Sequence, residues 1–302
     1  PLGAVQLLPG DGESIGSALV ADKRIKAVLF TGSTDTANLI NRSLATRGGE
    51  IIPLVAETGG QNAMLVDSSA LLEQVVVDVI NSAFGSAGQR CSALRVLFVQ
   101  EEIYPRTMEL LKGAMAELVV GEPQWLVSDI GPVIDQSALS LLKSHVDTMK
   151  KRYEVLYQCS LDESLAAGYF MPPTAIVIDQ LAALEKEVFG PVLHIIKFKR
   201  SNLDAVIEQI NATGYGLTLG IHSRINETVE YIRTRVHAGN CYVNRNMTGA
   251  VVGLQPFGGE GLSGTGPKAG GPNYLIRLCH ERTYTVDTTA AGGNASLMSL
   301  PD

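Results

Sequence analysis

Short apolar runs alternate with amphipathic stretches along most of the chain. In the first part, the runs at 26–30 and 51–57 have the length and composition of buried strands, and the run at 4–10 ends in a Pro-Gly turn signal. Ile15 and Leu19 have the spacing of one helix face, and a helical pattern up to about residue 45 follows the run at 26–30. This part of the chain therefore predicts a β-α-β-α-β unit, the repeat of a nucleotide-binding sheet.

A second series of the same kind begins near residue 62. It predicts strands at 62–67, 95–100, 217–223 and 240–244. It predicts helices at 70–83, 105–119, 137–150, 203–211 and 226–236. The Gly-rich and Pro-rich stretch 244–273 predicts a loop, and the alternation at 283–289 is typical of an edge strand. We therefore expect an α/β protein without internal repeats.

Composition narrows the class of protein. The chain has 302 residues, 45% of them hydrophobic, which is enough for two domains. A net charge of −7 without a basic stripe argues against a nucleic-acid partner, and no apolar run reaches the ~20 residues of a transmembrane segment. The four cysteines show no metal-binding spacing, so we expect no metal site and a reducing, cytoplasmic location. The first residues resemble the middle of a domain, so we expect a fragment of a longer protein.

Cys91 is the first candidate for chemistry. It follows the Gly-rich stretch FGSAGQR and precedes a predicted strand. Loops of this kind bring backbone N–H groups close to a reacting atom, and a thiol there can be exposed with a lowered pKa. A lone cysteine is more often a buried structural residue, which is the interpretation kept for Cys159, Cys241 and Cys279. For Cys91 both interpretations remain open.

Glu57 is the second candidate, because it ends an apolar strand and is followed by Thr-Gly-Gly. The carboxyl ends of strands are where α/β sheets form their active-site crevice. Apolar surroundings would raise the pKa of this carboxyl towards the range of a general base. Taken alone, a solvated Glu at a strand end is the more common explanation.

Three further segments have the composition of ligand-binding loops. FTGST, at 30–34, leads from a strand into a helix with Ser33 or Thr34 as its N-cap, and such helix ends bind phosphate, although the spacing is not GxGxxG. KEVFGPV, at 186–192, and QPFGGEGLSGTG, at 255–266, place an aromatic residue beside Gly-Pro or Gly-Gly. That pattern is typical of backbone that approaches a ligand, and equally of tight turns.

Taken in order, the segments FTGS, E-x-GG, GQxC, E-x-FGP and PFGG resemble the motif set of the aldehyde dehydrogenase superfamily over residues 3–275. A mild departure is Ala37, where the family often has Gly. The resemblance implies the C-terminal part of the aldehyde dehydrogenase fold. That part comprises the second half of a Rossmann-like NAD-binding domain at 1–60, an α/β catalytic domain at 61–275, and an oligomerisation strand (a β-flap) with a C-terminal tail at 276–302.

A narrower resemblance rests on ETGG at 57–60, CSALR at 91–95 and the segment 244–275. These are similar to the L-glutamate γ-semialdehyde (1-pyrroline-5-carboxylate) dehydrogenases. The closing TVDTTAAGGNASLMSL resembles a motif of the proline utilization A family, which fuses a proline dehydrogenase to this module. The resemblance implies NAD(P)-dependent oxidation of L-glutamate γ-semialdehyde to L-glutamate, the second step of proline catabolism.

The resemblance also implies roles for individual residues. Cys91 would attack the aldehyde and form a thioester, Glu57 would activate the water that hydrolyses it, and the Cys91 N–H would be one oxyanion donor. Glu187 would bind the nicotinamide ribose and Phe189 would pack near the ring. The implied cofactor-binding set is Gly32, Ser33, Thr58, Gly59, Glu187 and Phe189. The implied substrate-binding set is Ser92, Gly249, Ala250 and Phe257.

The expected cofactor is NAD, with NADP open, and FAD is expected only in a separate upstream proline dehydrogenase domain. In the family a second oxyanion donor, an Asn, and a Lys for the adenosine ribose lie upstream of this sequence. The fragment alone is therefore expected to be weak or inactive, and its parent active. The expected partners are a small aldehyde substrate, further copies of the parent in a homo-oligomer, and the fused proline dehydrogenase domain.

Three alternatives compete with this interpretation. A hydrolytic dehydrogenase for another semialdehyde, such as succinate semialdehyde, is disfavoured by the segment 244–275. An acylating relative that passes the thioester to coenzyme A does not need a general base for water, so Glu57 counts against it. A non-catalytic homologous domain kept for assembly would be marked by loss of Cys91 or Glu57, and both are present.

Overall fold

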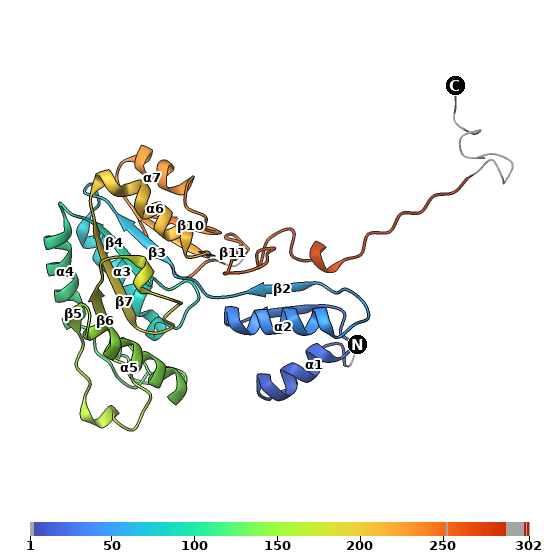
Figure 1. The fold of residues 1–302 in the computed structure, drawn as a ribbon, viewed down its shortest axis with the longest axis horizontal. Coiled ribbons are helices and arrows are strands. Elements are labelled where there is room, and N and C mark those ends of the chain that lie inside the picture. Colours follow the sequence, from blue (N-terminus) through green and yellow to red (C-terminus); the bar gives the residue numbers. More distant parts are fainter. Residues whose placement is uncertain (1–2, 252, 288–298, 300, 302) are drawn as a thin grey trace.

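A seven-stranded sheet forms the centre of the larger part of the molecule (Figure 1). The structure is a computed structural model that describes residues 3–251, 253–287, 299 and 301. The strand order is β10-β9-β3-β4-β7-β6-β5, and all neighbours are parallel except β5, which runs antiparallel to β6. The strands are β3 (Ala63–Val66), β4 (Val96–Gln100), β5 (Glu154–Gln158), β6 (Thr174–Val177), β7 (Val192–Phe198), β9 (Thr218–His222) and β10 (Asn240–Val243).

Helices connect these strands and cover the sheet. They are α3 (Leu72–Phe84), α4 (Tyr104–Ala116), α5 (Gln136–Lys150), α6 (Leu203–Ala212) and α7 (Asn226–Arg233). Every residue of β3 and β4 is buried, as expected for parallel strands that are covered on both faces. Their unbroken apolar runs are what made them recognisable in the sequence. The predicted α/β class and these five helices are confirmed.

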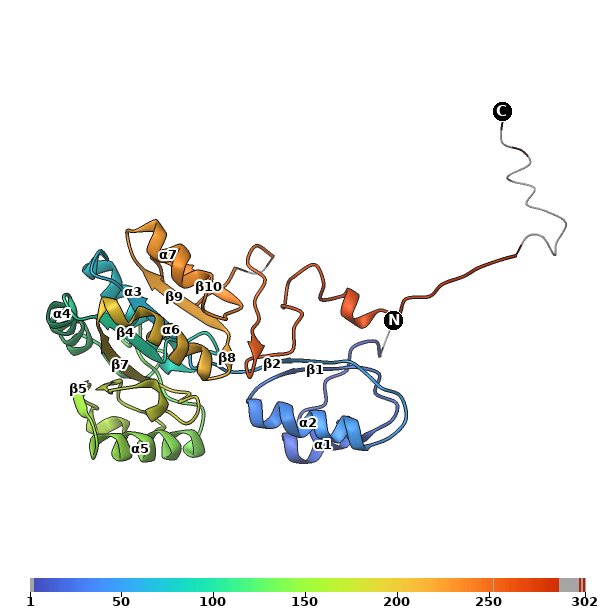
Figure 2. The same ribbon diagram turned by 45° about the horizontal axis from the view of Figure 1, so that its top comes forward.

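A second parallel pair, β1 (Val28–Thr31) and β2 (Leu54–Glu57), forms the smaller unit with α1 (Ser17–Ala21) and α2 (Thr34–Thr46) (Figure 2). A π-helix at Gly12–Gly16 precedes α1. Ser33 is the N-cap of α2, because its hydroxyl accepts the Thr36 N–H at 3.1 Å. Of the two predicted caps, the structure therefore selects Ser33.

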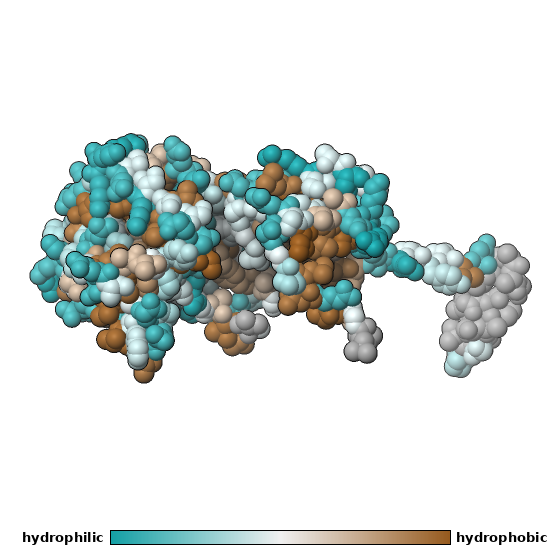
Figure 3. Space-filling view, turned by 90° about the horizontal axis from the view of Figure 1, so that it is seen from below, coloured by the Kyte–Doolittle hydropathy of each residue, from teal (hydrophilic) through white to brown (hydrophobic). Residues whose placement is uncertain are grey.

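The smaller unit leaves more of its apolar surface in water than the central sheet does. Apolar residues gather on its face in Figure 3. Among them, Leu29 of β1 is 48% exposed and Leu39 of α2 is 62% exposed, whereas the apolar side chains of β3 are almost completely buried. The burial that stabilises the described chain is therefore concentrated around the seven-stranded sheet.

Two predicted strands are not formed. Residues 4–10 are exposed and unpaired, so the first strand of the predicted β-α-β-α-β unit is wrong. Residues 283–287 are likewise not part of a strand in the described chain, and 288–289 lie outside the described residues. The physical reason is the same in both places: an alternating or apolar run becomes a strand only where a neighbouring strand accepts its backbone hydrogen bonds.

The chain crosses between the two parts twice. The first crossing is the ETGG segment between β2 and β3. The second is the returning segment 257–265, which includes the short strand β11 (Glu260–Gly261), paired with β8 (Tyr215–Gly216). Thr265 N donates to Ala56 O at 2.9 Å, and Thr58 N donates to Ser263 O at 2.9 Å. This returning segment therefore packs a Gly-rich loop directly onto the carboxyl end of β2.

Candidate active site

Cys91 lies in a turn between α3 and β4 and is half-buried. The turn is reached through a 3₁₀ segment, Gly85–Gly88, in which Ser86, Ala87 and Gly88 have φ of 56°, 53° and 65°. Only Gly fits at position 88, since a β-carbon there would lie 2.1 Å from the carbonyl oxygen of Gly190. The glycine that begins GQRC is thus required by the close approach of two loops.

Asn62, a buried residue that directly follows ETGGQ, binds the backbone of this turn. Asn62 Nδ2 donates to the carbonyls of Cys91 at 2.7 Å and Ala93 at 2.9 Å, and its Oδ1 accepts the Thr218 N–H at 3.2 Å. The sequence analysis did not single out Asn62. In the sequence, Asn62 is marked only as an amide residue shortly after Gly59 and Gly60. A side-chain amide whose nitrogen and oxygen both form hydrogen bonds fixes the backbone around a reacting atom.

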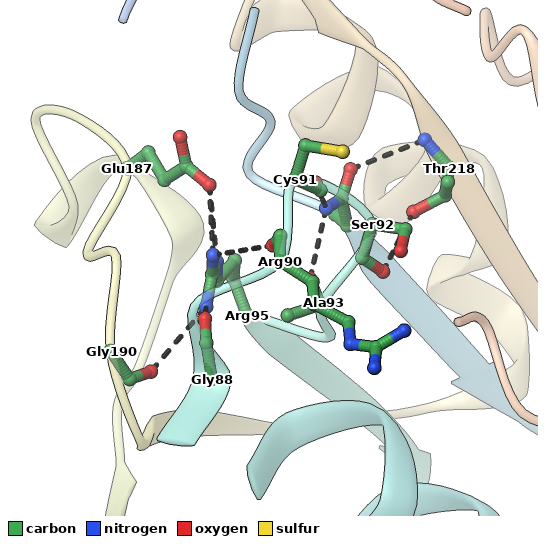
Figure 4. Close-up of polar contacts among 10 residues, drawn as sticks. Gly88, Arg90, Cys91, Ser92, Ala93, Arg95, Glu187, Gly190 and Thr218 are labelled. Carbon is green, nitrogen blue, oxygen red and sulfur yellow. Dashed lines mark hydrogen bonds and ion pairs between the residues drawn. The ribbon is translucent and has the colours of Figure 1, made fainter. Parts of the chain in front are cut away.

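Glu187 lies beside this turn and is paired with a residue that the sequence analysis also missed (Figure 4). Arg95, at the start of β4, is 1% exposed and contacts Glu187 Oε1 through Nη2 at 3.0 Å. Phe189 stacks near the same guanidinium, 5.1 Å from ring centroid to Cζ, and is 45% exposed. The E-x-FGP loop and the Cys91 turn therefore meet around one buried cation.

Glu57 ends β2, and the returning segment surrounds its carboxylate. Oε2 accepts the Gly259 N–H at 3.3 Å, whereas Oε1 is buried without a hydrogen-bond partner. A β-carbon at Gly258 would lie 2.5 Å from Oε1, so the PFGG glycines are what let the backbone close over this carboxylate. Burial raises the pKa of Glu57 to about 7, against the opposing effects of the Gly259 N–H and Lys268. The predicted apolar setting of Glu57 is present.

The thiol of Cys91 differs from the sequence-based expectation. Burial raises its pKa above the ordinary value, and the charges of Glu187 and Glu57 raise it further, while the Ser92 N–H lowers it. The expected lowering is therefore wrong for this structure. The same observation is informative, however, because it puts the thiol within electrostatic range of both carboxylates.

Four of the six residues predicted to bind the cofactor directly follow β1 or β2, and the other two, Glu187 and Phe189, lie in the loop before β7. Gly32 N donates to Glu57 O at 3.1 Å, so its N–H belongs to the sheet, and Ser33 caps α2. Thr58 is buried and donates to Leu262 O at 2.6 Å. Gly59 packs against Glu187: a β-carbon on Gly59 would lie 1.6 Å from Oε2. Gly59 and Glu187 are thus brought together, while Gly32 and Ser33 lie at the start of α2.

A cleft lies next to this edge of the smaller unit. Its volume is about 530 Å³, and Cys91 is not among its lining residues. Its walls come from one face of α2, the approach to β2, the returning segment and Arg277. Its lining includes Thr58, a predicted cofactor-binding residue, and Thr34, which follows the predicted Ser33.

The predicted substrate-binding residues fall into two places. Ser92 is buried beside the nucleophile and accepts Thr218 Oγ1 at its carbonyl oxygen, at 3.3 Å. Phe257 exchanges two backbone hydrogen bonds with Ala269, which holds the returning segment in a narrow loop. Gly249 has φ of +76°, and no atom of the described residues lies within 4 Å of where its β-carbon would be. Ala250 follows Gly249 and is partly exposed.

The loop that carries Gly249 is attached to the helix that precedes the nucleophile. Met247 is completely buried, and its N–H donates to Ser82 Oγ of α3 at 2.9 Å. Asn244 exchanges two side-chain hydrogen bonds with the Ser223 backbone. The loop is therefore positioned by α3, the helix that precedes the Cys91 turn, and by the backbone of Ser223, just after β9.

Neither a metal centre nor a membrane helix is found in the part of the chain that the structure describes. The described residues contain no group of three or more His, Cys, Asp or Glu side chains arranged to hold a metal ion. Within the same residues, every helix is too short or too polar to cross a bilayer.

Comparison with known proteins gives the site its relatives. The family model described as the aldehyde dehydrogenase family matches residues 1–284. The bifunctional protein PutA of Salmonella typhimurium is 57% identical over 298 residues, which cover 96% of this chain and 23% of that protein. The chain therefore spans about a quarter of the length of this curated relative.

Two solved structures resemble the chain. A variant of proline utilization A from Bradyrhizobium japonicum has a TM-score of 0.89 at 53% identity, covering 94% of this chain and 29% of that one. The 1-pyrroline-5-carboxylate dehydrogenase from Thermus, with bound NAD, has a TM-score of 0.83 at 35% identity, covering 90% of this chain and 52% of that one.

Proposed function

The chain belongs to the aldehyde dehydrogenase family, and from this premise we propose that the protein carrying it oxidises L-glutamate γ-semialdehyde to L-glutamate with NAD. The observation that carries the proposal is that the segment following Glu57 contacts both other residues: Gly59 packs against the Glu187 carboxylate, and Asn62 binds the Cys91 carbonyl. The printed names of the relatives, PutA and 1-pyrroline-5-carboxylate dehydrogenase, support the choice of substrate.

Cys91 is the proposed nucleophile. Its sulfur attacks the aldehyde carbon, and the developing oxyanion lies close to the N–H of Cys91 itself. Because Asn62 holds the carbonyls on both sides of the turn, the direction of that N–H is fixed before the substrate arrives. A thiol with a raised pKa must lose its proton, to the surrounding water, as it reacts.

Glu57 is the proposed base for the second half of the reaction. A carboxyl with a pKa of about 7 is partly ionised near neutral pH, so it can accept a proton from the water that hydrolyses the thioester. Its Oε1 has no protein partner and is therefore free for that water. An acylating enzyme would not need this carboxylate.

Residues at the ends of β1 and β2 fit a dinucleotide. The N-terminus of α2, capped by Ser33, would face the pyrophosphate, and Glu187 would hold the nicotinamide ribose with Phe189 near the ring. Thr58 and Gly59 would line the same edge. NAD, when bound, accepts the hydride from the substrate; NADP is the alternative cofactor.

The substrate's amino acid head group would be bound by neutral donors. Gly249 leaves open space around its backbone, so its N–H can approach a carboxylate closely. Ser92 supplies a hydroxyl beside the nucleophile, Ala250 adds little bulk, and Phe257 would line the path of the aldehyde. We further propose a cytoplasmic homo-oligomer fused to an FAD-containing proline dehydrogenase domain; the printed name of the relative, a bifunctional protein, supports a fusion.

The experiment is an NADH absorbance assay on the full-length protein that carries this chain. L-glutamate γ-semialdehyde and NAD should yield NADH and glutamate in equal amounts, without stimulation by coenzyme A. Succinate semialdehyde is the comparison substrate. Faster turnover of succinate semialdehyde would overturn the substrate assignment, and product formation only with coenzyme A would overturn the hydrolytic mechanism.

A further inference from the structure

Arg95 is the largest of the fully buried side chains, and the function proposed above does not use it. Burying a guanidinium is costly unless hydrogen bonds and an opposite charge compensate for the lost water. A buried cation next to an active site therefore calls for an account of each of its partners.

The partners of Arg95 come from only two loops. In the turn before the nucleophile, Nη1 donates to Gly88 O at 2.6 Å and Nη2 to Arg90 O at 3.0 Å. In the loop 187–190, Nε and Nη2 both donate to Glu187 Oε1, at 3.3 and 3.0 Å, and Nη1 reaches Gly190 O at 3.4 Å. The planar guanidinium thus joins the two loops by hydrogen bonds in fixed directions.

The ion pair also determines how Glu187 is oriented. Because Arg95 uses only Oε1, the other oxygen is directed at Gly59, where no β-carbon could fit. On the other side, the carbonyl of Arg90 immediately precedes Cys91. A shift of the guanidinium would therefore move the carboxylate and the nucleophile turn together.

We propose that Arg95 is a positioning residue that couples the carboxylate of Glu187 to the placement of Cys91. The inference rests on the proposed function, in which Glu187 holds the cofactor ribose and Cys91 attacks the aldehyde. It adds that one buried cation positions both the Glu187 carboxylate and the Cys91 turn, so that displacing either of them displaces the other.

The test uses the full-length protein and two readouts. The first is the rate at which iodoacetamide alkylates Cys91, measured by mass spectrometry across pH and expressed as the plateau rate constant of the thiolate. A purely electrostatic change at Glu187 shifts the midpoint of that profile, whereas displacement of the turn changes the plateau. The second readout is the KM for NAD.

Arg95→Met should lower the alkylation plateau about tenfold and raise the KM for NAD about tenfold, since hydrogen bonds from a charged donor are lost in both loops. The double variant with Glu187→Gln should be no worse than Arg95→Met alone, because both changes remove the same link. The control is Arg106→Met, which breaks an exposed Arg–Glu ion pair of 2.7 Å and should change neither readout.

Arg95→Lys keeps the charge but lacks the planar fork, and it decides the matter if Arg95→Met does not fold. It should keep the KM for NAD within about threefold of wild type and still lower the plateau at least about threefold. A folded Arg95 variant with an unchanged plateau, or losses that multiply in the double variant, would overturn the coupling. Alkylation needs no aldehyde oxidation. A wild-type protein that is inactive on the semialdehyde would therefore refute the proposed function, and the alkylation plateau would still test the role of Arg95.

Discussion

The α-carbon of Gly59 packs directly against the carboxylate of Glu187. A β-carbon at Gly59 would lie 1.6 Å from Oε2 and 2.6 Å from Cδ, far inside contact distance. Glu187 cannot simply turn away, because its Oε1 is held by the buried guanidinium of Arg95. The glycine of the E-x-GG motif is thus needed for the position of a side chain more than a hundred residues later in the chain.

Gly59→Ala should therefore impair the cofactor side of the site. We expect it to displace Glu187, raise the KM for NAD, and lower the free energy of unfolding by about 1–3 kcal/mol, as overpacking does in a filled interior. Steady-state kinetics and thermal unfolding of the same variant measure both effects. Gly113→Ala is the matched control, since nothing lies within 4 Å of a β-carbon on that exposed helical glycine. Equal behaviour of the two variants would contradict the packing argument.

Glu57→Gln should separate the two halves of the reaction. The variant keeps the shape of the side chain but cannot accept a proton, so thioester hydrolysis should slow on the order of 10²–10⁴-fold. A rapid-mixing experiment should show a burst of about one NADH per site followed by slow turnover. A variant without a burst would mean that Glu57 acts before or during hydride transfer, and full steady-state activity would remove it from the site.

The raised pKa of Glu57 also predicts a dependence of stability on pH. Burial raises the pKa from 4.5 to about 7, so the folded protein disfavours the ionised carboxylate. The contribution of Glu57 to the free energy of unfolding therefore falls as pH rises from 4.5 to about 7, and Gln lacks this loss. The Tm of Glu57→Gln relative to wild type should be higher at pH about 8 than at pH about 5. The exposed Glu122→Gln should show no such trend, and a pH-independent difference for Glu57→Gln would contradict the burial of its charge.

Cys91→Ala should abolish aldehyde oxidation. Removing the nucleophile leaves no route to the thioester, and we expect a loss of more than ~10³-fold in kcat. NAD affinity, measured by calorimetry, should stay close to wild type, because no cofactor contact is assigned to the sulfur. Cys279→Ala, at an exposed position, serves as the control. Turnover retained in Cys91→Ala would end the assignment of the nucleophile.

Ser92→Ala tests the reading of the substrate's head group. Ser92 is buried beside the nucleophile, and the proposed function makes its hydroxyl a donor to the substrate's head group. Loss of one hydrogen bond to a charged group should raise the KM for glutamate γ-semialdehyde about tenfold and hardly affect propanal. The measurement is kcat/KM for both aldehydes, with Ser140→Ala on the surface of α5 as the control. Equal losses on both substrates would show that Ser92 does not read the head group.

Much of the fold could be predicted from local patterns. The apolar runs of β3 and β4 predicted strands there, and Ser33 was one of two residues expected to cap α2. Among the described residues no strand forms at 4–10 or at 283–287, although the sequence pattern at both places suits one. A strand depends on what lies beside it, whereas a helix closes its own hydrogen bonds.

For the site, the sequence by itself determined which residue types were available and in what order: a cysteine after a Gly-rich loop, a carboxylate at a strand end, and two aromatic-glycine turns. Only the tertiary structure decided their environment. Glu57 has its raised pKa because it is buried where the returning segment, far away in the sequence, packs over it. Arg95 and Asn62, unremarkable in the sequence, proved to hold the nucleophile turn. Local propensity acts between neighbours in the chain, but burial and electrostatic coupling arise only when distant segments pack together.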